Sequence, residues 1–241
     1  MPKLSVLMPT YNYGQYIEQA INSLLKQDLS DLEIIISDDC STDNSKEIIK
    51  NLAKNNAKIK PFFQESNLGM VANWNWCLEQ AEGDYIIYLF ADDFLRSTDA
   101  LSRLISPLTI DARVSISASA RMIVDKNGAP MFVARDLRRP GIYSGEEIVR
   151  RCCEQVCNLV GEPSAVMFRK SAAVRGFDTT YRQLVDLEMW LHLANQGKVY
   201  FTDEPLVAFR RHEQQQTALN ASNPQTQTRS EEHTSELQSQ R

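Results

Sequence analysis

The sequence predicts an α/β fold in which a mostly parallel central sheet carries helices on both faces. Short apolar runs alternate with amphipathic segments over the first 95 residues, a pattern typical of parallel sheets with right-handed crossovers. The run Tyr85–Phe90 is apolar or aromatic throughout, which suits a central strand buried on both faces. Two such runs lead into adjacent carboxylates, Asp38–Asp39 and Asp92–Asp93. We expect both pairs at the C-terminal ends of their strands, where open α/β sheets bind ligands.

The composition is that of an ordinary globular protein. The 241 residues are 43% hydrophobic, which is enough for one large domain or two small ones. The net charge of −5 leaves no basic footprint, so we expect no nucleic-acid partner. The five cysteines are odd in number and lack zinc-ligand spacing. They indicate reduced thiols and a cytoplasmic location.

Nothing in the sequence predicts a membrane span. No apolar run approaches the ~18 residues that a spanning helix needs. The first strand begins close to the N-terminus, so we expect no secretory leader. Peripheral contact with a membrane, at its inner face, stays open.

The elements of the first half follow from apolar spacing and turn residues. Apolar side chains within Ile17–Leu25 recur on one helical face, and Asn44 with Glu47 predicts a capped second helix. Pro9 is expected to stop the first strand. We expect strands at residues 4–8, 33–37 and 59–63 and from 85 onward, and helices over 17–25, 44–53 and 70–81.

The second half is less regular. The turn Asp125–Gly128 predicts a hairpin between its flanking strands, and Ser144 or Gly145 is expected to cap a helix. We expect helices at residues 101–108, 145–152 and 184–195, and strands at 114–124, 131–134, 165–168, 198–201 and 206–209.

Three strand ends of the first half are predicted to meet at one edge of the sheet. The first strand leads into Thr10–Asn12, and the other two lead into the carboxylate pairs. A single Asp-Asp pair is more often a solvated turn, but the combination is more specific. No Gly-rich phosphate-binding motif is present in this half. A phosphorylated ligand would therefore be met by a divalent cation on the carboxylates.

Motifs between residues 3 and 212 also occur in the order of a known family. Ser5–Asn12 matches its opening strand, Ser37–Asp43 matches a D-D-G-S-T-D motif, and Ala91–Asp93 matches a DxD-type metal motif. Linking turns and acceptor-side motifs match at Asn67–Gly69, Ala81–Asp84, Arg175–Asp178 and Asp186–Leu191. The chain thus resembles the family-2 glycosyltransferases with the GT-A fold.

The sequence departs from that family at three places. Cys40 stands where glycine is usual, a tolerable change if the backbone avoids positive φ. Trp74–Asn75 stands where many members have an Arg-Asn pair, and Val185 stands where many have Glu.

The resemblance implies inverting transfer of a sugar from a UDP- or dTDP-sugar to a hydroxyl acceptor, assisted by Mn²⁺ or Mg²⁺. It implies that Asp93 ligates the metal and that Asp92 contacts the ribose or assists the metal. It further implies that Asp39 accepts a hydrogen bond from the imide N–H of the base. The remaining donor-binding residues that we infer from it are Pro9, Thr10, Tyr11 and Asn75.

The resemblance implies that Asp186 is the general base for the acceptor hydroxyl. A position near a helix N-terminus stabilises the ionised carboxylate, so burial would be needed to keep it basic. Glu188, about 200° round the helix, is the rival base. Arg210 and His212 are candidates for clamping the diphosphate or completing the metal site, although a solvated basic turn explains them equally well.

The resemblance also divides the chain. It implies a nucleotide-sugar-binding half at residues 1–95 and an acceptor-binding, catalytic half at 96–212. Residues 213–241 are nearly free of apolar side chains, so we expect a disordered tail. Within it, 229–239 resembles a translated sequencing adapter, in which case the natural C-terminus is lost.

Three functions follow from this sequence. The leading one is a glycosyltransferase that builds cell-surface polysaccharide, lipopolysaccharide or another glycoconjugate, acting on a saccharide, lipid-linked or other hydroxyl acceptor. A metal-dependent nucleotidyltransferase is an alternative, disfavoured because the loop at 11–14 has no Lys or Arg. An inactive or truncated nucleotide-sugar-binding protein is the third.

Overall fold

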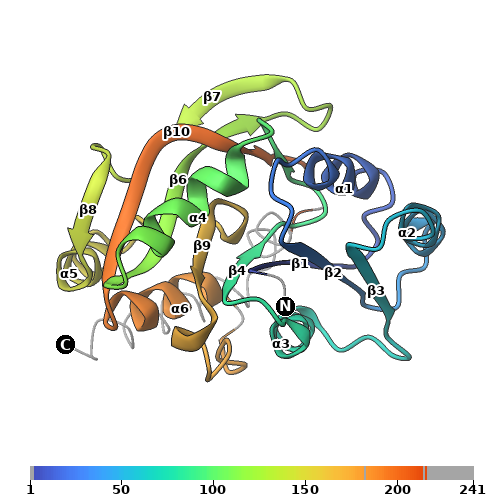
Figure 1. Cartoon of the computed structure of the whole chain (residues 1–241), viewed down its shortest axis with the longest axis horizontal. Helices are drawn as coiled ribbons and strands as arrows, with labels where there is room; N and C mark the ends of the chain where they lie inside the picture. Colours follow the sequence, from blue (N-terminus) through green and yellow to red (C-terminus); the bar gives the residue numbers. More distant parts are fainter. Residues whose placement is uncertain (1–2, 182, 214, 216–241) are drawn as a thin grey trace.

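The computed structural model describes residues 3–181, 183–213 and 215. The tail beyond residue 215, with its adapter-like stretch at 229–239, lies outside the described residues. Within them the strands form one mixed sheet in the order β3-β2-β1-β4-β9-β6-β10-β5, with β7 added on β6 and β8 on β10. The sheet runs on across the predicted boundary at residue 95 (Figure 1).

The first half is the predicted alternation of strands and helices. Strands β1, β2, β3 and β4 are mutually parallel, as short crossovers through helices require. The elements are β1 (Leu4–Thr10), α1 (Ile17–Leu25), β2 (Leu32–Asp38), α2 (Ser45–Ala53), β3 (Ile59–Phe63), α3 (Met70–Gln80) and β4 (Tyr85–Tyr88).

The second half adds longer and partly antiparallel strands. Strand β9 (Val166–Arg169) lies antiparallel between β4 and β6, so β6 again runs parallel to β4. Strand β10 is parallel to β6. The other elements are β5 (Phe94–Leu95), α4 (Ala100–Ile110), β6 (Val114–Val124), β7 (Pro130–Ala134), β8 (Gly141–Ser144), α5 (Gly145–Gln155), α6 (Val185–Ala194) and β10 (Lys198–Arg210). Short 3₁₀ turns lie at Pro163–Ala165 and Lys170–Ala172.

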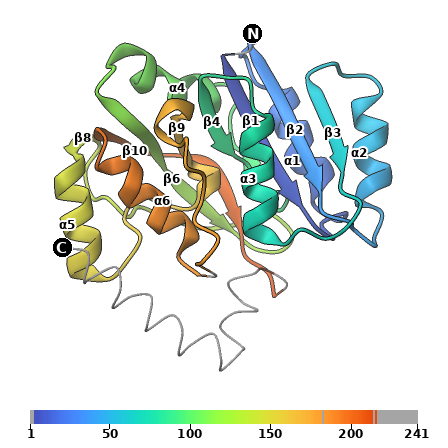
Figure 2. The same cartoon turned by 90° about the horizontal axis from the view of Figure 1, so that it is seen from below.

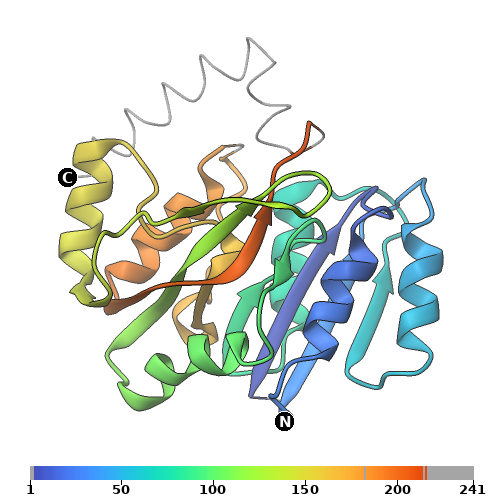
Figure 3. The same cartoon turned by 90° about the horizontal axis from the view of Figure 1, so that it is seen from above.

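Helices cover both faces of the sheet, as predicted, and each face has its own apolar cluster. Side chains alternate along a strand, so Val6 of β1 joins one cluster and Leu7 joins the other. The first cluster packs under α3, α5 and α6, whose side Figure 2 shows with α3 and α6 in front. The second packs under α1, α2 and α4, the side seen in Figure 3. No helix in the described residues is long and apolar enough to cross a membrane.

The first strand does not stop at Pro9, and that prediction is wrong. Strand β1 continues through Thr10, whose carbonyl accepts from the N–H of Asp39, just after β2, at 2.9 Å. Because successive residues face opposite neighbours, Pro9 faces the β4 side. Strand β4 pairs with β1 only as far as Leu7, so the missing N–H of Pro9 costs no ladder hydrogen bond.

Other local predictions need correction. Asn44 occupies the N-cap of α2 but makes no capping hydrogen bond. Asp43 instead accepts from Ser45 N at 3.0 Å and, with its other oxygen, from Gly14 N at 2.8 Å. The two short strands expected at 198–201 and 206–209 are one strand, β10, with register shifts around Pro205. Cys40 has φ of 67°, so this backbone does not avoid positive φ.

Candidate functional site

Five strands bring chemistry-bearing residues to one edge of the sheet. Strands β1, β2 and β4 end there, and so do β6 and β10, because both run parallel to β4 through β9. Thr10 and Asp38 are register partners at the ends of β1 and β2. The Asp92–Asp93 pair follows β4, and Arg210–His212 follows or closes β10. This edge therefore unites segments more than 200 residues apart in the sequence.

Asp39 is held by the backbone. Its Oδ1 accepts from Leu68 N at 2.7 Å and its Oδ2 from Gly69 N at 3.0 Å. The side chain is only 3% exposed. The preceding Asp38 accepts from Ser41 N at 3.2 Å, and its Oδ1 is buried without a partner among the described residues. Since a carboxylate oxygen has two lone pairs, Asp39 keeps acceptor capacity for one further N–H.

Asp92 and Asp93 form a more crowded corner. Asp93 Oδ1 accepts from Arg210 N at 3.0 Å, whereas its Oδ2 is buried and has no partner among the described residues. Burial and the neighbouring charge of Asp92 raise the pKa of the Asp93 carboxyl well above its ordinary value. A divalent cation would offset the repulsion between these adjacent carboxylates and would give the buried Asp93 oxygen a partner.

His212 supplies a nitrogen to this corner. Its Nε2 lies 3.0 Å from Asp92 Oδ2, and its Nδ1 is buried without a partner among the described residues. The ring packs against Tyr16 and Tyr13, with centroid separations of 4.9 and 5.9 Å. The structure thus places the predicted candidate His212 beside Asp92, whereas the sequence gave no sign of Tyr13. Burial, with the charges of Asp92 and Asp93, raises the pKa of the Tyr13 phenol.

The Arg210 side chain is bonded within the protein and does not form a solvated basic turn. Its guanidinium is buried and donates from Nε to the Asp92 carbonyl at 2.8 Å, from Nη1 to the Lys126 carbonyl at 2.9 Å and from Nη2 to Gln19 Oε1 at 2.6 Å. It also lies 4.6 Å over the ring of Tyr16. A buried cation so engaged fixes the Asp92 loop, and we no longer assign it to the diphosphate.

The described residues do not include a ready-made metal centre, because no group of three or more His, Cys, Asp or Glu side chains is arranged to hold one. The donor set at the edge nevertheless fits such an ion. Carboxylate oxygens such as those of Asp92 and Asp93 are the ligands that Mn²⁺ and Mg²⁺ prefer. Asp93 Oδ2 has no hydrogen-bond partner among the described residues, and the His212 ring lies beside the pair. Phosphate oxygens of a bound ligand would supply further contacts.

Asp186 lies in the first turn of α6, which follows Leu184 in a left-handed conformation. Its Oδ2 accepts from Asn158 Nδ2 at 3.0 Å. Burial raises the pKa of Asp186 to about 6, with a smaller contribution from the charge of Glu162. A carboxylate with that pKa is a competent general base near neutral pH.

The rival base is already paired. Glu188 accepts from Arg175 Nη2 with both oxygens, at 2.6 and 2.8 Å. His192, further along α6, lies 2.9 Å from Gln196 Nε2 on the helix surface. The geometry therefore favours Asp186 over Glu188.

Asn75 is also occupied. Its Nδ2 donates to the Phe177 carbonyl at 2.8 Å, and its Oδ1 accepts from Phe177 N at 2.7 Å. It lies close against Gly176, where an added Cβ would come within 2.7 Å of Asn75 Oδ1. Trp74 packs in the core beside Phe90 and Phe177. Trp74 and Asn75 therefore fix the Arg175–Asp178 turn. Because both polar atoms of the Asn75 amide are engaged there, we do not assign Asn75 to binding of the nucleotide-sugar donor.

The remaining predicted donor-binding residues lie along the end of β1. Tyr11 is 46% exposed at the edge, so its ring is free to stack on a planar base. Pro9 and Thr10 are buried in the strand, and the Thr10 hydroxyl has no partner among the described residues. The following Asn12 has φ of 60° and accepts from Thr42 N at 2.8 Å, which ties this loop to the Ser37–Asp43 motif.

A buried charge network was missed by sequence reasoning. Arg121 of β6 is 7% exposed and pairs with Asp136 and with Glu162, to which Nη2 donates at 3.0 Å. The charge of Glu162 raises the pKa of both Asp93 and Asp186. Glu162 therefore lies electrostatically between Asp93 and Asp186. Asp136 and Glu162 are 15 and 41 residues from Arg121 in sequence, so no local pattern could have found this network.

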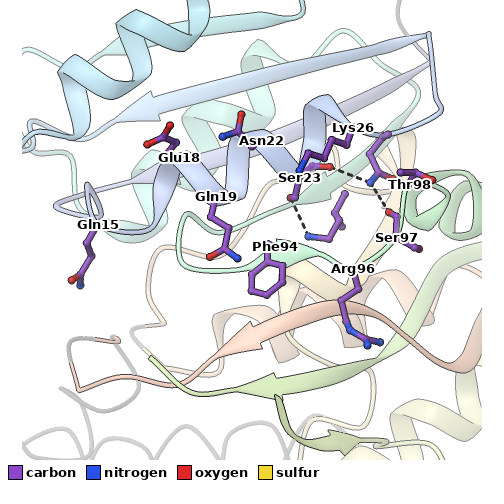
Figure 4. Close-up of a pocket in the computed structure, with 12 residues that line it drawn as sticks. Gln15, Glu18, Gln19, Asn22, Ser23, Lys26, Phe94, Arg96, Ser97 and Thr98 are labelled. Carbon is purple, nitrogen blue, oxygen red and sulfur yellow. Dashed lines mark hydrogen bonds between the residues drawn. The ribbon is translucent and has the colours of Figure 1, made fainter. Parts of the chain in front are cut away.

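A groove of about 600 Å³ runs between α1 and residues 94–98. In Figure 4, Gln19 points toward Phe94, while Gln15 and Lys26 point outward. Its floor is fixed by hydrogen bonds from Leu95 N to Ser23 Oγ and from Gln27 Nε2 to the Ser97 carbonyl. None of the edge carboxylates lines it, so it is separate from the Asp92–Asp93 pair.

Known proteins resemble this chain both in sequence and in fold. The family model described as glycosyl transferase family 2 matches residues 5–173. A GalNAc(5)-diNAcBac-PP-undecaprenol beta-1,3-glucosyltransferase of Campylobacter jejuni is 46% identical over 105 residues, which are 43% of this chain and 34% of the relative. The chain spans only 38% and 34% of the length of two of the curated relatives it matches.

Solved structures share the fold. TarS of Staphylococcus aureus (residues 1–349), in complex with UDP-GlcNAc, superposes with a TM-score of 0.72 at 22% identity, covering 92% of this chain and 61% of that one. The mannosyltransferase PcManGT of Pyrobaculum calidifontis, in complex with GDP-Man and Mn²⁺, gives 0.64 at 16% identity, covering 91% and 60%. The fold is therefore GT-A. With a family model that covers most of its length, the chain belongs to glycosyltransferase family 2.

Proposed function

We propose that this protein is an inverting, metal-dependent glycosyltransferase that moves a sugar from a UDP- or dTDP-sugar to a hydroxyl acceptor. The observation that carries the proposal is the pairing of two corners. At one, Asp93 has a raised pKa and an unpartnered buried oxygen. At the other, Asp186 has a pKa of about 6. The first suits a cation that holds a diphosphate, and the second suits removal of one proton from a hydroxyl.

Each residue has a defined task in this proposal. Asp39 accepts the imide N–H of uracil or thymine, and Tyr11 stacks on the base beside Pro9 and Thr10. Asp93 would hold the divalent ion, Mn²⁺ or Mg²⁺. Asp92 would assist the metal or contact the ribose, and His212 would complete the metal site. The ion, when bound, offsets the charge that develops on the leaving nucleoside diphosphate.

Asp186 takes the proton of the acceptor hydroxyl as that oxygen attacks the anomeric carbon. The bond from the sugar to the diphosphate breaks on the opposite face, so the configuration inverts in one displacement. Asn158 holds the Asp186 carboxylate in place through its 3.0 Å hydrogen bond. No covalent sugar–enzyme intermediate is needed, in keeping with a single base.

The donor and setting are supported by the relatives. The TarS neighbour binds UDP-GlcNAc and the PcManGT neighbour contains Mn²⁺, and the Campylobacter relative is named for an undecaprenol-linked substrate. We propose that the present chain acts in the cytoplasm, at the inner face of a membrane, in polysaccharide or glycoconjugate synthesis. Its acceptor is a saccharide, a lipid-linked saccharide or another hydroxyl compound.

A panel of UDP-, dTDP- and GDP-sugars with Mn²⁺ or Mg²⁺ tests the proposal through release of the nucleoside diphosphate. We expect metal-dependent release from a uridine or thymidine donor, accelerated by an acceptor. Binding of UDP without turnover of any donor would indicate a non-catalytic binder. Formation of a nucleotide-sugar from a nucleoside triphosphate and a sugar phosphate would indicate a nucleotidyltransferase.

A further inference from the structure

The segment 126–142 exposes three apolar side chains. Met131 and Phe132 of β7 are 57% and 47% exposed, and Ile142 of β8 is 53% exposed. Both strands are additions to the side of the main sheet order, and β7 lies along its outer margin (Figure 1). Met131 and Phe132 are consecutive residues of β7, so their side chains project from its two faces, and both are exposed at the margin of the sheet.

Positive charge surrounds these side chains. We define the β7 flank as the exposed residues Lys126, Met131, Phe132, Arg135, Arg138, Arg139 and Ile142. The segment 126–142 holds one carboxylate, Asp136, and it is paired with the buried Arg121. Every exposed charge of the β7 flank is therefore positive, although the whole chain carries −5. Arg211 adds a further cation 5.4 Å over the Phe132 ring.

The flank cations are not neutralised by the protein. Neither Lys126 nor Arg135, Arg138 or Arg139 forms an ion pair with any residue that the structure describes. By contrast, the exposed Arg150 of α5 pairs with Glu154. Unpaired cations beside exposed Phe and Met are the combination that binds an anionic bilayer, because the apolar groups enter the headgroup boundary while the cations meet lipid charge.

We propose that the β7 flank docks on an anionic lipid bilayer. The flank is also joined to the candidate site at both ends. At the hairpin turn the Lys126 carbonyl accepts from Arg210, which holds the Asp92 carbonyl. At the other end Asp136 pairs with Arg121, which binds Glu162. Docking there brings the candidate site close to the lipid surface, a consequence that rests on the proposed function and suits a lipid-linked acceptor.

Vesicle co-sedimentation of the full chain tests the docking without any enzyme assay. The probes are vesicles of phosphatidylcholine alone and of phosphatidylcholine with phosphatidylglycerol. We expect binding only to the anionic vesicles, weakened by added salt. Met131→Ser with Phe132→Ser, and separately Arg135→Gln with Arg138→Gln and Arg139→Gln, should each reduce the bound fraction at least about tenfold.

The matched control is Ile110→Ser with Val174→Ser, because these side chains are 81% and 87% exposed but lie outside the flank. The control should bind as the unaltered chain does, and circular dichroism should show all variants folded. Equal binding by every variant would place the contact elsewhere in the chain. Absence of binding by the unaltered chain, or equal binding to neutral vesicles, would also overturn the proposal. Neither result bears on nucleotide-sugar turnover, so the docking and the proposed function fail separately.

Discussion

Two Asp-Asp pairs lie at the same edge of the sheet, and their carboxylates have different hydrogen-bond partners. Asp39 accepts backbone N–H groups with both oxygens, from Leu68 and Gly69. Asp93 accepts one, from Arg210, and its other oxygen is buried without a partner among the described residues. The pairs have the same sequence, so the difference arises from the segments that reach them from elsewhere in the chain.

The comparison shows how environment separates two roles for one residue type. The two backbone donors fix both oxygens of Asp39 in place, so this carboxylate is positioned to accept a ligand N–H. Burial beside Asp92 penalises the charged form of Asp93, so Asp93 gains most from a cation. The predictions below test whether the two pairs are as different as this geometry implies.

The largest effect is expected from Asp93→Asn. The substitution removes a proposed ligand of the metal ion, which contributes several kcal/mol of charge stabilisation in the transition state. We therefore expect metal-dependent donor turnover to fall by about 10³-fold or more. The measurement is the release of nucleoside diphosphate with saturating Mn²⁺. Asp31→Asn, at an exposed position, is the control and should leave turnover unchanged. Substantial remaining metal-dependent activity in Asp93→Asn would move the metal to other residues.

Asp186→Asn should lower transfer by about 10²-fold or more, because general-base catalysis is lost. In the unaltered enzyme, the Asp186 carboxyl must be ionised to act. With a pKa of about 6, the transfer rate should fall about tenfold per pH unit well below pH 6. Rates between pH 4.5 and 8, at saturating donor, test this. A profile without that acid limb, or full activity in the variant, would remove Asp186 as the base.

Asp39→Ala should destabilise the fold, because it leaves the N–H groups of Leu68 and Gly69 without their acceptor. A hydrogen bond to a charged group contributes about 1.5–3 kcal/mol, so we expect the free energy of unfolding to fall by about 2–4 kcal/mol. Asp93→Asn should show no comparable loss without metal, since it removes a charge that burial penalises. Urea unfolding of both variants makes the comparison direct. Equal losses would mean that the two pairs are not distinct.

A smaller effect is expected on the pH dependence of the protein's thermal stability, through Asp186. The pKa of Asp186 rises from 3.8 to about 6 on folding, so the folded state binds its proton more tightly. Stability is therefore lost as the pH rises through that window, and it stays reduced above pH 6. Asp186→Asn should raise the melting temperature at pH 8 more than at pH 4.5. A gain that is independent of pH would contradict the raised pKa.

The smallest effect concerns Cys40, in the first of the two motifs. Its φ of 67° lies in the left-handed region, which is costly for a residue with a Cβ and open to glycine. Cys40→Gly should stabilise the protein by about 0.5–1 kcal/mol, because the relief exceeds the added flexibility of the unfolded chain. Chemical denaturation measures it. Cys153→Gly, in the interior of α5, is the matched control and should destabilise by a similar amount.

Much of the first half was predictable because its signals are local. Apolar periodicity gave β1 to β4 and α1 to α3, and the geometry of parallel strands implied that their ends would converge. The error at Pro9 arose because proline is tolerated in a strand where the neighbour has already ended. The error at Asn44 arose because the adjacent Asp43 accepts the backbone hydrogen bond at this helix start instead. Motif resemblance then selected Asp93 and Asp186 from the many carboxylates.

The rest depended on contacts between distant residues. Arg210 looked like an exposed basic turn until its bonds to Gln19, Lys126 and Asp92 were known. Asn75 is engaged by the Phe177 backbone, 102 residues away. The Arg121–Glu162 pair joins a strand to a 3₁₀ turn across 41 residues. A sequence pattern cannot reveal which polar side chains are already hydrogen-bonded within the protein. That information determines which of them are available to bind a ligand.

The central claim is that Asp93 holds the donor through a metal while Asp186 acts only on the acceptor. Calorimetric titration of UDP, with and without Mn²⁺, tests it in the unaltered chain and in the Asp93→Asn and Asp186→Asn variants. The account predicts that Mn²⁺ tightens UDP binding in the unaltered chain and in Asp186→Asn but not in Asp93→Asn. Metal-tightened binding that persists in Asp93→Asn, or is lost in Asp186→Asn, would contradict it.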